Sequence, residues 1–261
     1  MAHVVALYRY PIKGFTPEPC KQITVLEDGR IAGDRVLGFC FANSSAEDTA
    51  WSSKHEFVAL VNTPKLARLK LNFDHHALTL QISLDNTILL TATLHEREHI
   101  AHVLADYVGQ LSDNPLHLKP ERLPLRLVGD GISPRYQDNA AGHISLHSRE
   151  SLRTVANAIG VTTLDERRFR SNIVIEGVTA WDELHWVGQK VRIGRLIFEV
   201  VMVKTRCLAT HANPDTGERD VSLLKTLTHT FGQEKPTFAV ALQLIGCGGQ
   251  LAVGDEISLT G

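Results

Sequence analysis

The chain has 261 residues, of which 43% are hydrophobic and 21% are charged, and its formal net charge is −2. This length and composition are typical of a folded protein with one large domain or two small ones. A charge so close to zero gives no indication of the extended basic surface with which proteins bind nucleic acids or anionic membranes, although it is compatible with a local basic pocket. We therefore expect neither nucleic acid nor a membrane as a partner.

The apolar stretches and the cysteines indicate a cytoplasmic protein. No apolar run reaches the roughly 20 residues of a membrane span, and the first residues read as a strand because no basic segment precedes them. The four cysteines are Cys20, Cys40, Cys207 and Cys247, with no C-x-x-C pair among them. We therefore predict neither a disulfide framework nor a structural zinc site, and a reducing compartment is expected.

Short β-rich segments separated by turn residues run along much of the chain. Many strands with few helices predict a mainly β, barrel-like fold with helical insertions, of the α+β class. The predicted strands are HVVALYRY (3–10), FVALV (57–61), LARLKLNF (66–73), ALTLQISL (77–84), TILLTATL (87–94), NIVIEG (172–177), LIFEVVMVKT (196–205) and FAVALQLI (238–245).

Three segments have the periodicity of helices. The first is 96–109. The second is 149–159, with Ser148 as its N-cap and Gly160 at its end, and the third is 221–231, with Asp220 as its cap and Gly232 at its end.

A proline-rich segment divides the chain. Residues 114–124 contain three prolines and predict a seam between an N-terminal half, 1–115, and a C-terminal half, 116–261.

The sequence HEREH at 95–99 matches the H-E-x-x-H pattern of zinc proteases. On a helix, the apolar face formed by Ile100, Leu104 and Tyr107 would lie roughly 140° away from His95 and His99. The histidines are therefore predicted to face solvent. A catalytic zinc site needs embedded ligands, including a third oriented one, so we expect no zinc here.

Cys207 lies where a β-rich run ends and the turn sequence 213–217 follows. If the charges of Lys204 and Arg206 lie near its sulfur, they favour the thiolate, which attacks electrophiles or binds metals. The alternative is a buried cysteine that packs as a small hydrophobe.

Three arginines precede the predicted strand at 172–177. The guanidinium groups of Arg167, Arg168 and Arg170 suit a phosphate or a carboxylate, and Asn172 can both donate and accept. The alternative is a charge run in solvent. The Lys-Gly pair at 13–14 would let a loop approach an anion closely, which is a weak signal by itself.

Together these segments resemble the MOSC family, named for the C-terminal domain of molybdenum cofactor sulfurase. The pattern is most similar to the mitochondrial amidoxime reducing component and its bacterial counterparts. The segments that carry the resemblance are YRYPIKG (8–14), GDR (33–35), ISLHSRESL (144–152), RFRSNIVIEG (168–177), WDEL (181–184), RCLATHANPDTG (206–217) and VGDEISL (253–259).

The resemblance implies a MOSC β-barrel domain preceded by an N-terminal β-barrel-like domain. It also implies a molybdenum cofactor, Mo-molybdopterin, with neither pyridoxal phosphate nor zinc. By position, Cys207 would ligate molybdenum, while Arg170 and Asn172 would hold the pterin or its phosphate. The other implied cofactor-binding residues are Lys13 and Arg35 at the phosphate end, with Gly14, His143 and Arg206.

The implied activity is the two-electron reduction of N-hydroxylated or N-oxide compounds. The sequence has no C-x4-C-x2-C iron–sulfur segment, so we expect electrons from a separate ferredoxin, flavoprotein or cytochrome b5-like protein. Two alternatives stay open. One is a non-catalytic carrier or binding module for molybdenum cofactor or for sulfur, and the other is a thiol protein that has lost the cofactor.

Overall fold

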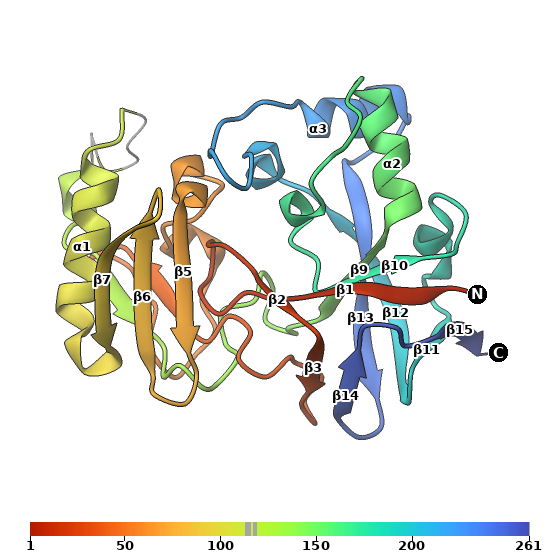
Figure 1. The fold of residues 1–261 in the computed structure, drawn as a ribbon, viewed down its shortest axis with the longest axis horizontal. Coiled ribbons are helices and arrows are strands. Elements are labelled where there is room, and N and C mark those ends of the chain that lie inside the picture. Colours follow the sequence, from red (N-terminus) through yellow and green to blue (C-terminus); the bar gives the residue numbers. More distant parts are fainter. Residues whose placement is uncertain (113–115, 117–118, 261) are drawn as a thin grey trace.

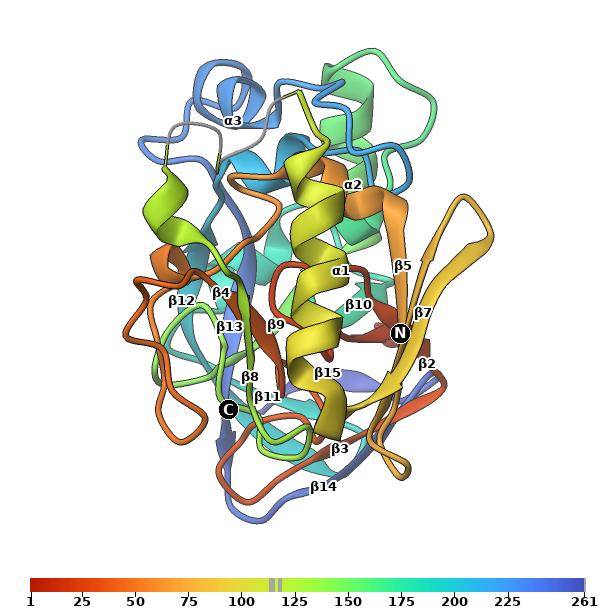
Figure 2. The same cartoon turned by 90° about the vertical axis from the view of Figure 1, so that its left-hand side faces the viewer.

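The computed structural model describes residues 1–112, 116 and 119–260 (Figures 1 and 2). Strands dominate it, and the predicted mainly β fold with helical insertions is confirmed. The strands are β1 (His3–Arg9), β2 (Glu18–Cys20), β3 (Gln22–Val25), β4 (Gly38–Cys40), β5 (Leu69–Asp74), β6 (Thr79–Leu84), β7 (Thr87–Thr93), β8 (Arg126–Val128), β9 (Ile144–Ser148), β10 (Ile173–Glu176), β11 (Lys190–Ile193), β12 (Leu196–Thr205), β13 (Thr237–Ile245), β14 (Gly249–Ala252) and β15 (Ile257–Thr260). The α-helices are α1 (Arg97–Gly109), α2 (Arg149–Ala158) and α3 (Leu223–Lys225).

The first half of the chain folds around the antiparallel sheet β5-β6-β7, which α1 covers on one face (Figures 1 and 2). Alternate strand residues such as Leu80 and Ile82 are buried against Ile100 and Leu104 of α1. A short 3-10 turn at 94–96 leads into α1, and the backbone N–H of Thr93 donates to the Glu96 carboxylate (3.1 Å) there. The helix predicted at 96–109 is confirmed.

The histidines of the HEREH segment lie on the outside of this helix. His95, His99 and His102 are all exposed, whereas Ile100 and Leu104 on the opposite face are fully buried. The predicted solvent-facing histidine stripe is therefore confirmed.

The double variant His95→Gln and His99→Gln is expected to change the free energy of unfolding by less than about 0.5 kcal/mol. Urea unfolding measures this change. The matched control is Ile100→Ala on the buried face, which is expected to cost about 2–5 kcal/mol. A loss of several kcal/mol in the double variant, or the loss of a stoichiometric zinc, would contradict the assignment.

The second half is built on a larger sheet. In the described part of the chain this sheet has eight strands, in the order β15-β11-β12-β13-β9-β10-β1-β2. β9 and β10 are parallel and are joined through α2, and the other neighbours are antiparallel. β1 and β2 come from the first 20 residues, but β1 pairs with β10 and β2 pairs with β1, so the beginning of the chain belongs to this sheet. The seam expected at 115/116 borders residues 113–115, which lie outside the described residues.

The helix predicted at 149–159 is confirmed as α2. The hydroxyl of Ser148 accepts a hydrogen bond from the backbone N–H of Ser151 (3.1 Å), as the N-cap assignment requires. Gly160 follows the helix with φ of +75°, a left-handed conformation that favours glycine. Among the described residues, no helix is long and apolar enough to cross a bilayer.

The helix predicted at 221–231 is only partly present. Its α-helical part is the single turn α3, which continues as a π-helical turn over Thr226–Thr230. The cap assigned to Asp220 is wrong, because the Asp220 carboxylate accepts two hydrogen bonds from Arg168 (2.7 and 2.9 Å). The backbone N–H of Leu224 instead donates to Nε2 of His211 (3.1 Å).

The strand predicted at 57–61 is wrong. Phe57 forms an isolated bridge to Cys40, and the chain then turns. Asn62 stabilises this turn, because its Oδ1 accepts from the N–H of Ala59 (2.9 Å) and its Nδ2 donates to the carbonyl of Phe57 (3.0 Å). Asparagine side chains that bond to nearby backbone compete with strand pairing in this way.

Candidate functional site

A cavity of about 380 Å³ opens between the segment 51–61 of the first half and β12 of the second half. Its volume lies in the range of small-molecule sites. Six of the predicted site residues line this cavity: Lys13, Gly14, Arg35, Arg170, Arg206 and Cys207. The two others, Asn172 and His143, do not line it.

Cys207 follows β12 and begins a 3-10 turn over Leu208–His211. Just before it, the N–H of Arg206 donates to the carbonyl of Pro236 (2.7 Å). The carbonyl of Cys207 accepts from the backbone N–H (3.0 Å) and the hydroxyl (2.9 Å) of Thr210. These bonds fix the backbone on both sides of a half-buried thiol that borders the cavity.

Arg35 and Arg170 lie against the same aromatic ring. Their guanidinium carbons are 4.9 and 4.3 Å from the ring centre of Tyr10, within the range of cation–π contacts. Both arginines have left-handed backbone, with φ of +54° and +53°. Such conformations are uncommon outside glycine and gather at functional sites, where the surrounding structure holds them in place.

Lys13 is buried under the cavity and has no free N–H. Its ammonium donates to the carbonyls of Tyr136 (2.8 Å) and Gln137 (3.3 Å) and to the carboxylate of Asp138 (3.3 Å). A lysine has three such protons, so all of them are committed to the protein. Burial also lowers the pKa of Lys13. This side chain therefore fixes the segment 136–138 and, with it, Asp138 in the cavity wall.

Asp138 is the carboxylate around which the cations of the cavity gather. Its side chain faces the open cavity and keeps 67% of its surface exposed. Desolvation alone would raise its pKa, but Lys13, Arg35 and Lys204 together hold the pKa of Asp138 well below its usual range. Asp138 thus stays ionised and offsets part of the local positive charge.

Asn172 supports the cavity wall, whereas His143 does not line the cavity. The side chain of Asn172 donates to the carbonyl of Tyr8 (3.1 Å) and accepts from the backbone N–H of Ser145 (3.3 Å), and Ser145 lines the cavity. His143 is half-buried, and within the described residues its Nδ1 has no hydrogen-bond partner. Burial and the nearby charge of Lys204 lower the pKa of His143, so its ring is neutral at pH 7.

Two family descriptions match the chain in succession. Residues 1–110 match the MOSC N-terminal beta barrel domain, and residues 133–258 match the MOSC domain. The chain belongs to the MOSC family. The resemblance found in the sequence motifs is thereby confirmed.

Relatives of this MOSC chain include two groups of named proteins. It is 34% identical over 139 residues to molybdenum cofactor sulfurase of Caenorhabditis briggsae, a match that covers 53% of this chain and 19% of that protein. It is 26% identical over 247 residues to mitochondrial amidoxime-reducing component 1 of Mus musculus, covering 83% and 67%. The chain therefore spans about a fifth of the sulfurase and two thirds of the amidoxime-reducing component.

A solved structure is also similar to this MOSC chain. The YuaD protein of Bacillus subtilis aligns with a TM-score of 0.44 and 12% identity, covering 98% of this chain and 93% of that one.

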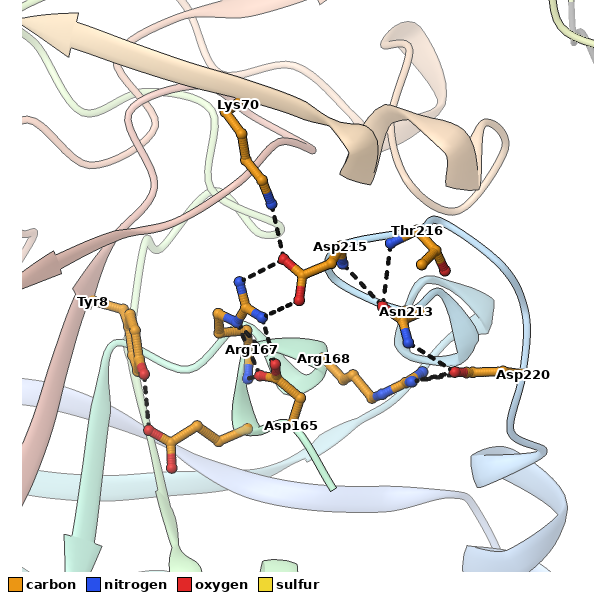
Figure 3. A network of polar contacts seen from close by, with 10 residues as sticks. Tyr8, Lys70, Asp165, Arg167, Arg168, Asn213, Asp215, Thr216 and Asp220 are labelled. Atoms are coloured by element: carbon orange, nitrogen blue, oxygen red, sulfur yellow. Dashed lines mark hydrogen bonds and ion pairs between the residues drawn. The ribbon is translucent and has the colours of Figure 1, made fainter. Parts of the chain in front are cut away.

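The loop that follows Cys207 in this MOSC chain is held by a network of ion pairs (Figure 3). The carboxylate of Asp215 accepts from Lys70 of β5 (2.9 Å) and from Arg167 (2.8 Å), and Arg167 also pairs with Asp165 (2.5 Å). Asp215 therefore joins the loop to both halves of the chain. Hydrogen bonds from both arginine and lysine lower the pKa of Asp215 to about 2.

The three arginines before β10 thus have different partners. Arg167 binds Asp165 and Asp215, Arg168 binds Asp220, and both are committed to carboxylates of the chain (Figure 3). Arg170 alone of the three carries no carboxylate partner within the described residues, and it faces the cavity. None of the three is therefore a solvated charge: Arg167 and Arg168 are bound to carboxylates of the chain, whereas Arg170 is available to an anion in the cavity.

Replacing Asp215 by asparagine is expected to loosen the loop at 208–219. Its two partners lose a charged acceptor that is partly exposed, so the loss of local stability should be about 1 kcal/mol. Amide hydrogen exchange of this loop measures the effect. Asp28→Asn, which removes an exposed partner of Arg30 in another turn, is the matched control. Equal exchange in both variants would show that the network does not restrain the loop.

Several polar cavity residues were absent from the site predicted from sequence, among them Asp138, Ser145 and Lys204. Lys204 was considered only as a charge near Cys207. It lies two residues before Arg206, and this spacing on β12 could have suggested that the two cations share a face. Asp138 carried no comparable signal, because tertiary contacts alone bring it to the cavity, whereas Ser145 belongs to the segment 144–152 that carries the family resemblance.

Proposed function

We propose that this MOSC protein binds a molybdenum cofactor in the cavity and reduces N-hydroxylated or N-oxide compounds. The observation that carries the proposal is that a half-buried thiol, Cys207, and a cluster of cations line the same cavity. A thiolate is a soft donor that suits a sulfur-rich metal centre. Guanidinium groups suit the phosphate of a pterin cofactor. The similarity to proteins named for molybdenum cofactor and for amidoxime reduction supports the same assignment.

Each residue would have a separate role. The sulfur of Cys207 would ligate the metal, and Arg35, Arg170 and Arg206 would hold anionic groups. Arg206 is positioned for this by the bond from its Nη1 to the carbonyl of Phe169 (2.8 Å). Asn172 would act through Ser145, which it holds at the cavity wall.

When bound, the cofactor would supply the two-electron chemistry, and the protein would supply the ligand, the orientation and the anion site. The reaction would consume two electrons and two protons and convert the N–OH group of the substrate into N–H and water. We propose a separate ferredoxin, flavoprotein or cytochrome b5-like protein as the electron donor.

A non-catalytic role is the second candidate. The 34% identity to a molybdenum cofactor sulfurase over 139 residues favours a module that carries cofactor, or sulfur on Cys207, without turnover. In that case the cavity would bind the same ligand but would not reduce a substrate.

A reduction assay separates the two candidates. Protein from a molybdenum-sufficient host is supplied with an amidoxime and a reduced viologen dye, and the amidine product is quantified. The proposal expects amidine formation coupled to dye oxidation, with a reaction that lacks protein as the control. Bound cofactor without any amidine formation would reject the reductase and leave the carrier.

A further inference from the structure

Lys204 is a cation of the cavity that has no partner for its ammonium group. It lies near the end of β12, three residues before Cys207, and lines the same cavity. Within the described residues, its Nζ makes neither a hydrogen bond nor an ion pair. Lys13 differs sharply, because its three protons are all donated to acceptors of the protein.

Within the described residues, every other cation that lines the cavity except Lys54 also donates to the protein. Arg35 pairs with Asp34, Arg170 donates to the carbonyl of Phe15, and Arg206 donates to the carbonyl of Phe169. A carbonyl leaves the charge of a guanidinium uncompensated. The cavity therefore presents positive charge that the protein itself does not neutralise, and Lys204 contributes its whole donor set to it.

Charge counting gives the same result. Among the described residues, the carboxylates that pair with cavity cations are Asp34, Asp138 and Asp220. The cations that line the cavity are Lys13, Arg35, Lys54, Arg168, Arg170, Lys204 and Arg206. The difference, seven minus three, is four positive charges at neutral pH. Burial and the neighbouring Arg206 lower the pKa of Lys204 to about 8, and burial lowers that of Arg206 to about 10. Both shifts come mainly from burial, and the carboxylate of Asp138 opposes them only in part.

We propose that Lys204 is an anchor for a phosphate-like oxyanion bound in this cavity, with Arg170 and Arg206 as the neighbouring charges. Two sources of such an anion exist under the proposed function, on which this inference rests for its ligand. One is the phosphate of the cofactor, and the other is an anionic group of the substrate. An ammonium with three free protons suits either source as a point charge.

The first test uses the full chain produced without cofactor, titrated with inorganic phosphate in a calorimeter at low salt. Lys204→Gln should weaken phosphate binding by about tenfold or more, which is the loss expected for a charge-assisted hydrogen bond. Lys204→Arg should restore most of the affinity. Lys190→Gln, an exposed lysine on β11, is the matched control and should bind as the unchanged chain does. Equal phosphate affinity in Lys204→Gln and the unchanged chain would overturn the proposal.

The second test identifies the source of the anion in protein purified with its cofactor. A lower pterin content in Lys204→Gln assigns the anchor to the cofactor phosphate. An unchanged pterin content, with a raised KM for a carboxylate-bearing amidoxime but not for a neutral one, assigns it to the substrate. If the protein contains no pterin at all, the proposed function fails, whereas the phosphate titration of the cofactor-free chain still decides the role of Lys204.

Discussion

Replacing Cys207 by serine is expected to abolish amidoxime reduction while most of the pterin stays bound. A serine hydroxyl is a harder and far less acidic donor than a thiol, so a metal in the cavity would lose its soft protein ligand. The arginines that would hold the cofactor are not touched, because Arg35 and Arg170 are fixed against Tyr10. We therefore expect activity to fall below detection and the molybdenum electron paramagnetic resonance spectrum to change.

The remaining cysteines provide the controls for this variant. Cys247 is exposed and Cys20 is partly buried, and neither lines the cavity of Cys207. Cys247→Ser and Cys20→Ser should keep both the native spectrum and most of the activity. Cys40 is a poorer control because it is fully buried in the core. A Cys207→Ser protein with the native spectrum and normal turnover would show that the ligand is another residue.

Replacing Arg170 by alanine is expected to weaken cofactor retention far more than the same change at Arg167. Arg170 faces the cavity, and its loss removes a charge-assisted contact of about 1.5–3 kcal/mol, or roughly 10- to 100-fold in affinity. Arg167 is bound to Asp165 and Asp215 (Figure 3) and does not line the cavity. Pterin content after gel filtration measures the difference.

Folding must be separated from binding in this comparison. Arg170→Ala keeps the Cβ atom at a left-handed position, so the backbone strain of the site is unchanged. Thermal unfolding of the cofactor-free variants checks that both fold. Arg170→Lys, which keeps the charge but loses the planar fork, should retain an intermediate amount of pterin. Equal pterin in the alanine variants of Arg170 and Arg167 would reject the assignment of Arg170.

The parts of the fold that were predicted well depend on local sequence. α2 follows from the cap at Ser148 and the stop at Gly160, and both signals act within one turn of the helix. The strand predicted at 196–205 coincides with β12. The wrong predictions involve polar side chains whose hydrogen bonds differ from those that the sequence suggested. Asp220 binds Arg168 instead of capping a helix, and Asn62 turns a segment whose apolar residues suggested a strand.

The candidate site divides in a similar way. Cys207 and Arg170 belong to recognisable motifs, and the structure brings both to one cavity. The partners of Lys13 could not be predicted, because Tyr136 and Asp138 lie more than 120 residues away in sequence. The sequence also could not show that the ammonium group of Lys204 has no hydrogen-bond partner among the described residues, because partners are decided by the folded structure.

The most direct test of the central proposal is to measure molybdenum and pterin in protein purified from a molybdenum-sufficient host. The proposal predicts about one molybdenum and one pterin per chain, as expected for one thiolate ligand at one cavity. Mass spectrometry of the metal and fluorescence of the oxidised pterin provide the two values. Protein that contains neither, and that takes up neither when supplied with free cofactor, would contradict the proposal.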